Sequence, residues 1–283
     1  MKQFKADRGF MTFAIGEQYL RLAYAQALSI KNVMPDAKYA VVIDETSGYL
    51  SSDRYDSVFD SVIQVANYGT NPMTLEWMAY GLSPWKETIK LDADVYFPES
   101  IDHWWSILRQ CDVWFPTQVY DYTGKVITSR WHRKLFDDNN LPDVYTALYY
   151  FRYSQLATTL FTNAKLITAD WDWFASDFLI NNRNPELRTD EVFALAALIT
   201  GVETCTVPGA TVPSFVHMKE QLIGLEDTNT PWPEQLYSTG TKHLDIHFYP
   251  QTKPVHFYRK EWMTDDRIEQ LERIRQSIIT GNR

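Results

Sequence analysis

Short apolar runs alternate with segments of helical periodicity through the first third of the chain. Apolar residues recur at helical spacing across Glu17–Lys31, and residues 73–84 also have helical character. Gly16, a turn signal, separates the first apolar run from the first helical segment. Buried strands are predicted at Phe10–Ile15, Tyr39–Asp44, Val58–Val65 and Thr88–Leu91.

This alternation predicts βαβ units and an α/β fold, with a mostly parallel central sheet flanked by helices. In such sheets, ligands collect at the carboxyl ends of the strands. Three of the predicted strands end at Ala14–Gly16, at Asp44, and at Asp92 with Asp94. We expect these three ends to lie side by side.

The second half of the chain is less regular. Residues 208–254 are rich in Pro, Thr and Gly and are expected to form loops with short strands. Thr264 is suited to open the last helix. A strand is predicted at Val113–Gln118, and helices are predicted at Glu191–Ile199 and Asp265–Ile279.

Asp92 and Asp94 follow the fourth predicted strand and are separated only by Ala93. Residues i and i+2 of an extended strand point to the same face, so both carboxylates can be aimed at one point. Like charges at that distance are costly to bury unless a cation lies between them. Carboxylates at this spacing suit Mg²⁺ or Mn²⁺, which can hold a diphosphate. A solvated Asp-X-Asp is the simpler alternative, and the apolar flanks disfavour it.

The composition is that of a chain with a substantial core. Hydrophobic residues make up 45% of the 283 residues and aromatic residues 15%, which excludes a disordered protein. No apolar run approaches the length of about 18 residues that a membrane span needs, so no integral membrane association is expected. The start of the chain lacks the apolar segment of a secretory signal, and the two cysteines, Cys111 and Cys205, suit a reducing compartment. We therefore expect a cytoplasmic protein.

The net charge of −9 argues against a protein that coats nucleic acid by bulk electrostatics, although it permits a local basic groove. Ten tryptophans and seventeen tyrosines exceed ordinary usage. Many of them must serve the core, but such a surplus also suits a site that stacks on the rings of sugars or bases.

The strand–helix–strand opening followed by Ile89–Asp94 resembles the GT-A glycosyltransferases, specifically those of glycosyltransferase family 8. The resemblance implies a Rossmann-like GT-A fold with an elaborated C-terminal half, and transfer of a sugar from a UDP-sugar donor. A Leu-Asp-Ala-Asp element in that family holds the metal that bridges the donor diphosphate, which assigns Asp92 and Asp94 to Mn²⁺ or Mg²⁺. The first strand and the acid after the second strand cradle the nucleoside, which assigns Ala14 and Asp44. Asp44 could equally cap a turn.

Family 8 also implies a late histidine, followed by a basic residue, that completes the metal and phosphate site. Two segments offer this pair: His256 with Lys260, and His217 with Lys219. Neither reproduces the full signature, because its glycine and proline are absent. We favour His256 as third ligand, since it ends a strand-like run and basic residues follow it. His217 is the second choice. Both lysines, and Lys90 from the Asp-X-Asp element, are assigned to the donor.

Asp190 and Glu191 match the acidic position that family 8 enzymes place near the acceptor and the transferred sugar, and we assign them catalytic roles. Asp190 also lies where the following helix would need an N-cap. The family implies retention at the anomeric carbon, and no enzymic nucleophile is obvious. A basic cluster beside Trp131 is interpreted as a solvated loop, with acceptor binding as the alternative; it comprises Arg130, His132, Arg133 and Lys134.

Leu141–Tyr145, Arg188–Glu191 and the two His/Lys pairs are similar to a divergent group of phage-encoded glycosyltransferases. That similarity implies 5-hydroxymethylcytosine in phage DNA as the acceptor, modified in the host cytoplasm, with the flipped base stacked on aromatic residues. The main alternative acceptor is a bacterial surface glycan or a lipid-linked sugar. A non-catalytic nucleotide- or carbohydrate-binding protein is the third interpretation, and the intact Asp92 and Asp94 count against it.

With no internal repeat and no linker, the simplest organisation is one domain over residues 1–283. Its nucleotide-sugar-binding half would be residues 8–120 and its acceptor-side half residues 121–263. Residues 264–283 would add a C-terminal helix.

Overall fold

The computed structural model describes most of the chain. Trp131, His132 and Cys205 lie outside the described residues, so the structure does not bear on the predictions made for them. The described residues are 2–49, 52–66, 72–130, 133–182, 186–201, 213–219, 236–237, 244–246 and 248–281.

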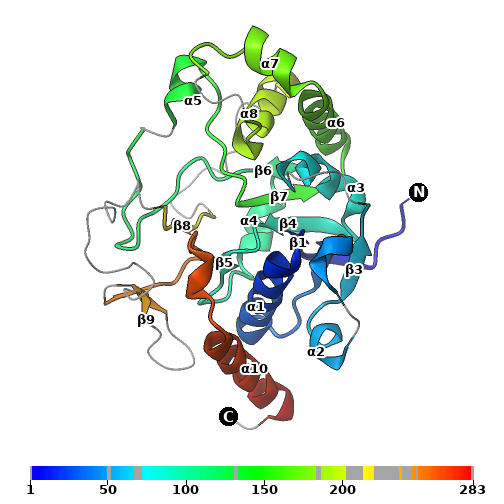
Figure 1. Ribbon diagram of the computed structural model, residues 1–283, viewed down its shortest axis with the longest axis vertical. Helices are drawn as coiled ribbons and strands as arrows, with labels where there is room; N and C mark the ends of the chain where they lie inside the picture. The colour runs from blue at the N-terminus through cyan, green and yellow to red at the C-terminus, as the bar shows by residue number, and fades with distance from the viewer. Residues whose placement is uncertain are drawn as a thin grey trace.

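A central sheet of six strands forms the middle of the described part of the molecule (Figure 1). Its strands are β1 (Ala6–Ala14), β2 (Tyr39–Ile43), β3 (Ser61–Gln64), β4 (Trp85–Leu91), β6 (Val113–Trp114) and β7 (Leu148–Arg152). In the order β3-β2-β1-β4-β7-β6, the first four strands are parallel and β7 is antiparallel to both of its neighbours. The mostly parallel sheet is confirmed. The strands β2, β1 and β4 are adjacent, so their carboxyl ends lie side by side as expected.

Helices cover both faces of this sheet (Figure 1). On one face lie α1 (Glu17–Val33), α4 (Trp104–Leu108) and α10 (Asp265–Thr280). On the other face lie α3 (Ala79–Leu82), α6 (Gln155–Ala169), α7 (Trp171–Asp177) and α8 (Thr189–Thr200). Shorter helical segments are η1 (Glu45–Ser47), α2 (Asp53–Asp56), η2 (Pro72–Met78), α5 (Lys134–Asp138) and η5 (Lys260–Trp262). Within the described ranges, none of the helices combines the length and the apolar character needed to cross a bilayer.

Strand β7 shows how the two cores form. Leu148 and Tyr150 contribute to the core that contains residues of α1 and α10, whereas Tyr149 and Phe151 contribute to the core that contains residues of α6 and α8. Successive side chains of a strand point to opposite faces. Because both faces are covered here, the strand is an unbroken apolar run without polar alternation.

Two small sheets come from the loop-rich segments. In the first, β5 (Val95–Tyr96) pairs with β12 (Val255–His256), which pairs with β8 (Val216–His217). The second sheet consists of β11 (Tyr249–Pro250), β10 (Asp245–Ile246) and β9 (Leu236–Tyr237). The sheet of β5, β12 and β8 places residues 255–256, late in the chain, beside the segment that follows β4.

Several elements differ from the sequence prediction. The strand expected at Val113–Gln118 ends at Trp114, because Pro116 cannot donate to a ladder and its carbonyl instead accepts from the amide of Tyr145 at 3.0 Å. Residues 73–84 form the 3₁₀ helix η2 and the short α3 rather than one α-helix. The last helix is confirmed, with the Thr264 side chain accepting from the amide of Arg267.

Candidate active site

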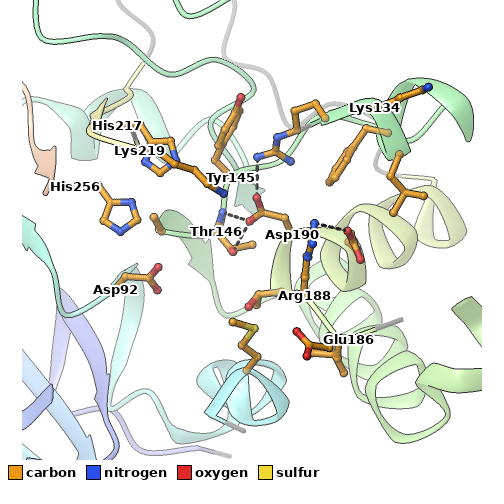
Figure 2. A pocket seen from close by; sticks show the side chains of 18 of the residues that line it. Asp92, Lys134, Tyr145, Thr146, Glu186, Arg188, Asp190, His217, Lys219 and His256 are labelled. Atoms are coloured by element: carbon orange, nitrogen blue, oxygen red, sulfur yellow. Dashed lines mark hydrogen bonds and ion pairs between the residues drawn. The ribbon is translucent and has the colours of Figure 1, made fainter. Parts of the chain in front are cut away.

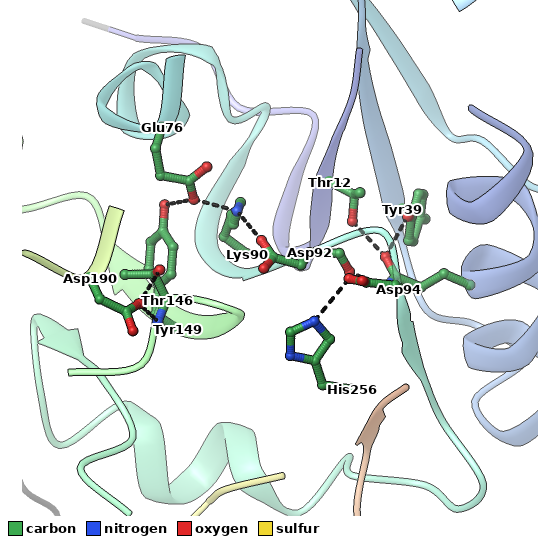
Figure 3. Close-up of polar contacts among 11 residues, drawn as sticks. Thr12, Tyr39, Glu76, Lys90, Asp92, Asp94, Thr146, Tyr149, Asp190 and His256 are labelled. Carbon is green, nitrogen blue, oxygen red and sulfur yellow. Dashed lines mark hydrogen bonds and ion pairs between the residues drawn. The ribbon is translucent and has the colours of Figure 1, made fainter. Parts of the chain in front are cut away.

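The backbone of the Asp-X-Asp turn is held by a buried side chain from α1. The Gln26 side-chain amide donates to the Asp92 carbonyl at 2.6 Å and to the Val95 carbonyl at 2.9 Å. Its own oxygen accepts from the hydroxyls of Thr12 and Tyr39, at 2.6 and 2.7 Å (Figure 3). Every polar atom of this side chain is therefore bonded, and the turn after β4 is fixed against the adjacent strands.

Asp94 receives two cationic partners from the segment around β12. The Nε2 atom of His256 lies 3.1 Å from one carboxylate oxygen (Figure 3). Lys260 Nζ lies 3.0 Å from the other oxygen. The pairing of β12 with β5, in which His256 is opposite Val95, brings these residues together. Burial would raise the pKa of Asp94, but the charges and hydrogen bonds of His256 and Lys260 outweigh it and hold that pKa below its ordinary value.

Asp92, Asp94 and His256 form a group with the composition of a metal site. One ligand atom from each lies within 4.8 Å of the others. Two carboxylates and an imidazole suit a divalent cation. In the protein without metal, burial lowers the pKa of His256, but the Asp94 carboxylate more than compensates and the pKa is raised. The Asp94 carboxylate therefore favours a positive charge on His256, as it would favour a bound cation.

His217 lies beside His256, on the neighbouring strand of the small sheet. It is opposite His256 in the β8–β12 pairing, and the two rings stack with centroids 4.9 Å apart. Among the described residues, the group with metal-ligand geometry contains His256 and does not contain His217. The geometry favours His256 over His217 as third ligand, and the choice remains a prediction.

Asp92 is tied to a buried charge network on the opposite side from His256. Lys90, with 2% of its surface exposed, donates to the Asp92 carboxylate at 3.0 Å and pairs with Glu76 from η2 (Figure 3). The Tyr149 hydroxyl donates to Glu76 at 2.9 Å. Burial would lower the pKa of Lys90, but the two carboxylates more than compensate and raise it, so Lys90 is charged. Within this network Lys90 orients the Asp92 carboxylate. A contact between Lys90 and the sugar donor remains a prediction.

The carboxyl ends of β1 and β2 form a second hydrogen-bonded corner. The Ser47 hydroxyl donates to the Ala14 carbonyl at 2.5 Å, and Asp44 accepts from the amide and hydroxyl of Thr46 at 3.1 and 2.8 Å. Asp44 therefore caps η1, which is the alternative considered from the sequence. Gly16, with a φ of 90°, makes the turn into α1 beside it. Nucleoside binding by Ala14 and Asp44 remains a prediction.

A cleft of about 1320 Å³ connects the Asp-X-Asp turn to the second half of the chain (Figure 2). His217, Lys219 and His256 lie along one side, and Asp190 and Arg188 lie on the opposite side (Figure 2). This volume exceeds the roughly 300–1,000 Å³ that is typical of pockets for small ligands. Carboxylates, imidazoles and an ammonium group therefore line the same cleft.

Asp190 is held in the cleft wall by three donors. Its carboxylate accepts from the amide and hydroxyl of Thr146 at 2.9 and 2.6 Å, and from Arg133 at 2.7 Å (Figure 2). The helix α8 begins at Thr189, so Asp190 is in its first turn and is not its N-cap, contrary to that expectation. Its negative charge in this position still suits the helix dipole.

Arg133 corrects the interpretation of the basic cluster as a solvated loop. Its side chain is 1% exposed, and its guanidinium carbon lies 3.7 Å from the ring centroid of Tyr145 and 4.4 Å from that of Phe136. Stacking between two rings and pairing with Asp190 offset part of the cost of burying this charge. Arg130 and Lys134 are exposed, as expected.

Glu191 is a buried acid at the edge of the cleft. It is 2% exposed, and its nearest charged partner is Arg188, at 3.5 Å. Burial raises the pKa of Glu191 to about 7, with the Arg188 charge acting in the opposite direction. The carboxyl group can therefore exchange a proton near neutral pH, which is a property of general acids and bases.

The lysines of the two His/Lys pairs have different surroundings. Lys260 pairs with Asp94, whereas Lys219 lies on the cleft wall with its Nζ atom 6.0 Å from the centroid of the Tyr258 ring. Burial lowers the pKa of Lys219, and the Asp190 charge partly offsets this. Lys219 lines the cleft on the His256 side, and Lys260 lies next to that side through its pair with Asp94.

Sequence reasoning missed the residues that support the site. Gln26 carried one signal, since it is a polar residue within the apolar face of α1. Glu76, Thr146 and Tyr149 carried none, because their partners lie far away in the sequence. Their roles follow only from the folded arrangement.

Comparison with solved structures identifies the fold. The chain is similar to the galactosyltransferase LgtC in complex with donor and acceptor sugar analogues, with a TM-score of 0.54, 11% identity and 95% of each chain covered. It is also similar to an active-site mutant of LgtC, with a TM-score of 0.51, 10% identity and 95% of each chain covered. No protein-family model and no curated protein matches the sequence. The likeness confirms the expected GT-A fold.

Proposed function

We propose that this chain is a metal-dependent glycosyltransferase that moves a sugar from a UDP-sugar to a hydroxyl group of an acceptor. The observation that carries the proposal is the group formed by Asp92, Asp94 and His256, whose ligand atoms lie within 4.8 Å of one another. Its two carboxylates follow β4 of a GT-A fold, and Asp92 and His256 line a cleft of about 1320 Å³. A site of this kind suits a diphosphate bound through a cation.

Mn²⁺ or Mg²⁺ suits these residues for two reasons, which are the chemistry of their ligand atoms and the negative charge of the two carboxylates. Asp92 and Asp94 bring two negative charges to one point, and in the absence of a cation Lys90, Lys260 and His256 compensate them. When bound, the ion would neutralise charge on the diphosphate and make the nucleotide a better leaving group. Lys90 would keep Asp92 oriented, and Lys260 and Lys219 would contact phosphate oxygens.

The other assigned residues would act on either side of the transferred sugar. Ala14 and Asp44, at the ends of β1 and β2, would face the nucleoside. Asp190 and Glu191, on the opposite side of the cleft, would face the sugar and the acceptor. Because Thr146 and Arg133 already bond to Asp190, its carboxylate would be held in place before the substrate binds.

The resemblance to family 8 supports a retaining reaction. The acceptor oxygen would form a bond to the anomeric carbon on the face from which the diphosphate leaves. The bond between that carbon and the phosphate oxygen breaks, and the leaving phosphate accepts the proton of the acceptor hydroxyl. Analysis of the product by NMR tests this proposal. A β-linked product from an α-linked donor would contradict retention.

The similarity to phage-encoded enzymes supports 5-hydroxymethylcytosine in DNA as the acceptor, modified in the host cytoplasm. Arg188 and Lys134 line the cleft and could contact backbone phosphates. The test is incubation with hydroxymethylcytosine DNA, UDP-sugars and Mn²⁺, followed by mass analysis of the nucleosides. A mass increase of one sugar on hydroxymethylcytosine supports this acceptor. Unchanged nucleosides, with transfer to a lipid-linked sugar or surface glycan, would contradict it.

Hydrolysis of UDP-sugars with Mn²⁺ tests the proposed activity without knowledge of the acceptor. The wild-type protein should release UDP slowly, and Asp94→Ala should not. Asp102→Ala is a matched control, because Asp102 is an exposed acid paired with Arg8. If the wild type neither hydrolyses nor binds any nucleotide sugar, the proposed enzyme is wrong. Binding without hydrolysis or transfer would favour a non-catalytic binding protein.

A further inference from the structure

Tyr258 has a backbone conformation that bulky residues rarely adopt. Its φ is 56°, in the left-handed region, and the Arg259 amide donates to the Phe257 carbonyl at 2.5 Å across it. A three-residue turn with positive φ at its centre is strained for a residue with a side chain. Glycine would fit this position without strain. Such conformations persist where the surrounding structure or the function requires them.

The turn at Tyr258 is bonded to the candidate metal group. The Phe257 amide donates to the Asp94 carbonyl at 3.0 Å. Lys260 Nζ donates to the Tyr258 carbonyl at 3.2 Å and also to the Asp94 carboxylate at 3.0 Å. The backbone of the turn therefore accounts for the placement of Lys260, but it does not account for an aromatic side chain at its centre.

The Tyr258 ring lies where a bound ligand could touch it. It is 39% exposed and belongs to the lining of the cleft. Lys260 Nζ is 5.5 Å and Lys219 Nζ is 6.0 Å from its centroid, and the His256 ring is 6.4 Å away at an interplanar angle of 75°. The ring thus lies within about 6 Å of two ammonium groups, on the side of the cleft that His256 lines.

We infer that Tyr258 is a donor-specificity residue whose ring packs against the sugar ring of the bound nucleotide sugar. The inference rests on the proposed function. Two ammonium groups beside the ring would attract the diphosphate, and the sugar bonded to that diphosphate would then lie within reach of the aromatic face. The C–H face of a sugar ring packs well on such a surface. Strain in the turn is retained because it aims the ring into the cleft.

Phe248 provides a matched control elsewhere in the molecule. It is also an aromatic residue with positive φ, 69°, and it is 87% exposed and does not belong to the lining of the cleft. Replacement of either residue by glycine relieves the same kind of backbone strain. Only Tyr258→Gly removes a ring from the cleft.

The experiment compares binding of UDP and of a UDP-sugar by calorimetry in Mn²⁺, with a thermal melt of each variant. The probe is whichever of UDP-glucose, UDP-galactose and UDP-arabinose the wild type binds most tightly. Tyr258→Gly should have a Tm equal to or above that of the wild type, bind the UDP-sugar roughly fivefold to tenfold more weakly, and bind UDP unchanged. Phe248→Gly should change neither affinity. Tyr258→Phe, which keeps the ring, should lose less affinity than Tyr258→Gly.

Three results would overturn the inference. Unchanged UDP-sugar affinity in Tyr258→Gly would mean that the ring does not touch the donor. Equal losses for UDP and for the UDP-sugar would place the contact on the nucleotide and not on the sugar. An equal loss in Tyr258→Phe would assign the contact to the hydroxyl group. If the wild type binds no nucleotide sugar at all, the proposed function itself fails and the inference fails with it.

Discussion

Lys260 donates to the carboxylate of Asp94 at 3.0 Å, although 166 residues separate them in the sequence. The same carboxylate approaches His256, from the strand that pairs with β5. The candidate metal group is therefore built from the turn after β4 and from a segment close to the last helix. Each half of the chain brings charges that the other half compensates.

Replacement of Lys260 by alanine should weaken nucleotide binding. The change removes an ammonium group beside the proposed diphosphate site and leaves Asp94 with His256. We expect roughly tenfold weaker binding of UDP in Mn²⁺, as for the loss of one charge-assisted hydrogen bond, measured by calorimetry. Lys86→Ala, a change at an exposed lysine of β4, is the control and should have no effect. Equal affinity of Lys260→Ala and wild type would remove Lys260 from the phosphate site.

Replacement of Lys90 by methionine should destabilise the fold. Glu76 would then be buried with only the Tyr149 hydroxyl as a partner, and removal of one member of a buried pair costs about 3–5 kcal/mol. Urea unfolding measures this loss. The double variant Glu76→Gln/Lys90→Met should lose less than the sum of the two single variants. Additive losses would show that Glu76 and Lys90 are not energetically coupled.

Glu191 should make stability fall as the pH rises. Burial raises its pKa in the folded protein to about 7, compared with 4.5 for the ordinary carboxyl group. The folded state therefore favours the neutral acid. The cost of ionisation is absent below about pH 4.5, grows between pH 4.5 and 7, and is complete above pH 7 at about 3 kcal/mol.

Glu191→Gln tests this dependence, because glutamine is neutral at every pH. The variant should be more stable than the wild type at pH 8 by urea unfolding, and the difference should shrink toward zero at pH 5. Glu99→Gln, at an exposed acid, should show no such trend. A constant difference between variant and wild type from pH 5 to 8 would contradict a raised pKa for Glu191.

Arg133→Lys should damage the Asp190 side of the cleft. Lysine cannot reproduce a flat guanidinium stacked between Tyr145 and Phe136, so the Asp190 carboxylate loses a fixed donor. We expect a lower Tm and, for sugar transfer, a kcat reduced roughly tenfold to a hundredfold. Arg130→Lys is the control, since Arg130 forms exposed ion pairs with Asp137 and Asp143. Equal effects of the two changes would show that burial of Arg133 is unimportant.

The first half of the fold could be predicted from the sequence because its signals are local. Apolar runs and a helical stripe gave β1, α1, β2 and β4, and parallel strands of an α/β sheet place their carboxyl ends together. Strand β7 was missed because a fully covered antiparallel strand has no alternation of polar residues. An apolar run of that kind does not by itself distinguish strand from helix.

The candidate site was predictable only in part. Only Ala93 separates Asp92 and Asp94, so a shared site for their carboxylates could be predicted from the sequence, although they lie in the turn after β4 and not in a strand. The approach of His256 depends on the pairing of β12 with β5, which no local pattern encodes. Burial of Arg133 was mispredicted for the same reason, since Asp190, its partner, is 57 residues away. Charged residues in a polar stretch are usually solvated, and only the tertiary contacts overturn that expectation.

The most direct test is calorimetric titration of UDP into the wild-type protein and into Asp94→Asn, each with Mn²⁺ and with EDTA. We expect the wild type to bind UDP in Mn²⁺ and to lose most of that binding in EDTA, and we expect Asp94→Asn to bind weakly in both. UDP affinity that is the same with Mn²⁺ and EDTA, and the same in both proteins, would contradict a metal-dependent nucleotide site at Asp92, Asp94 and His256.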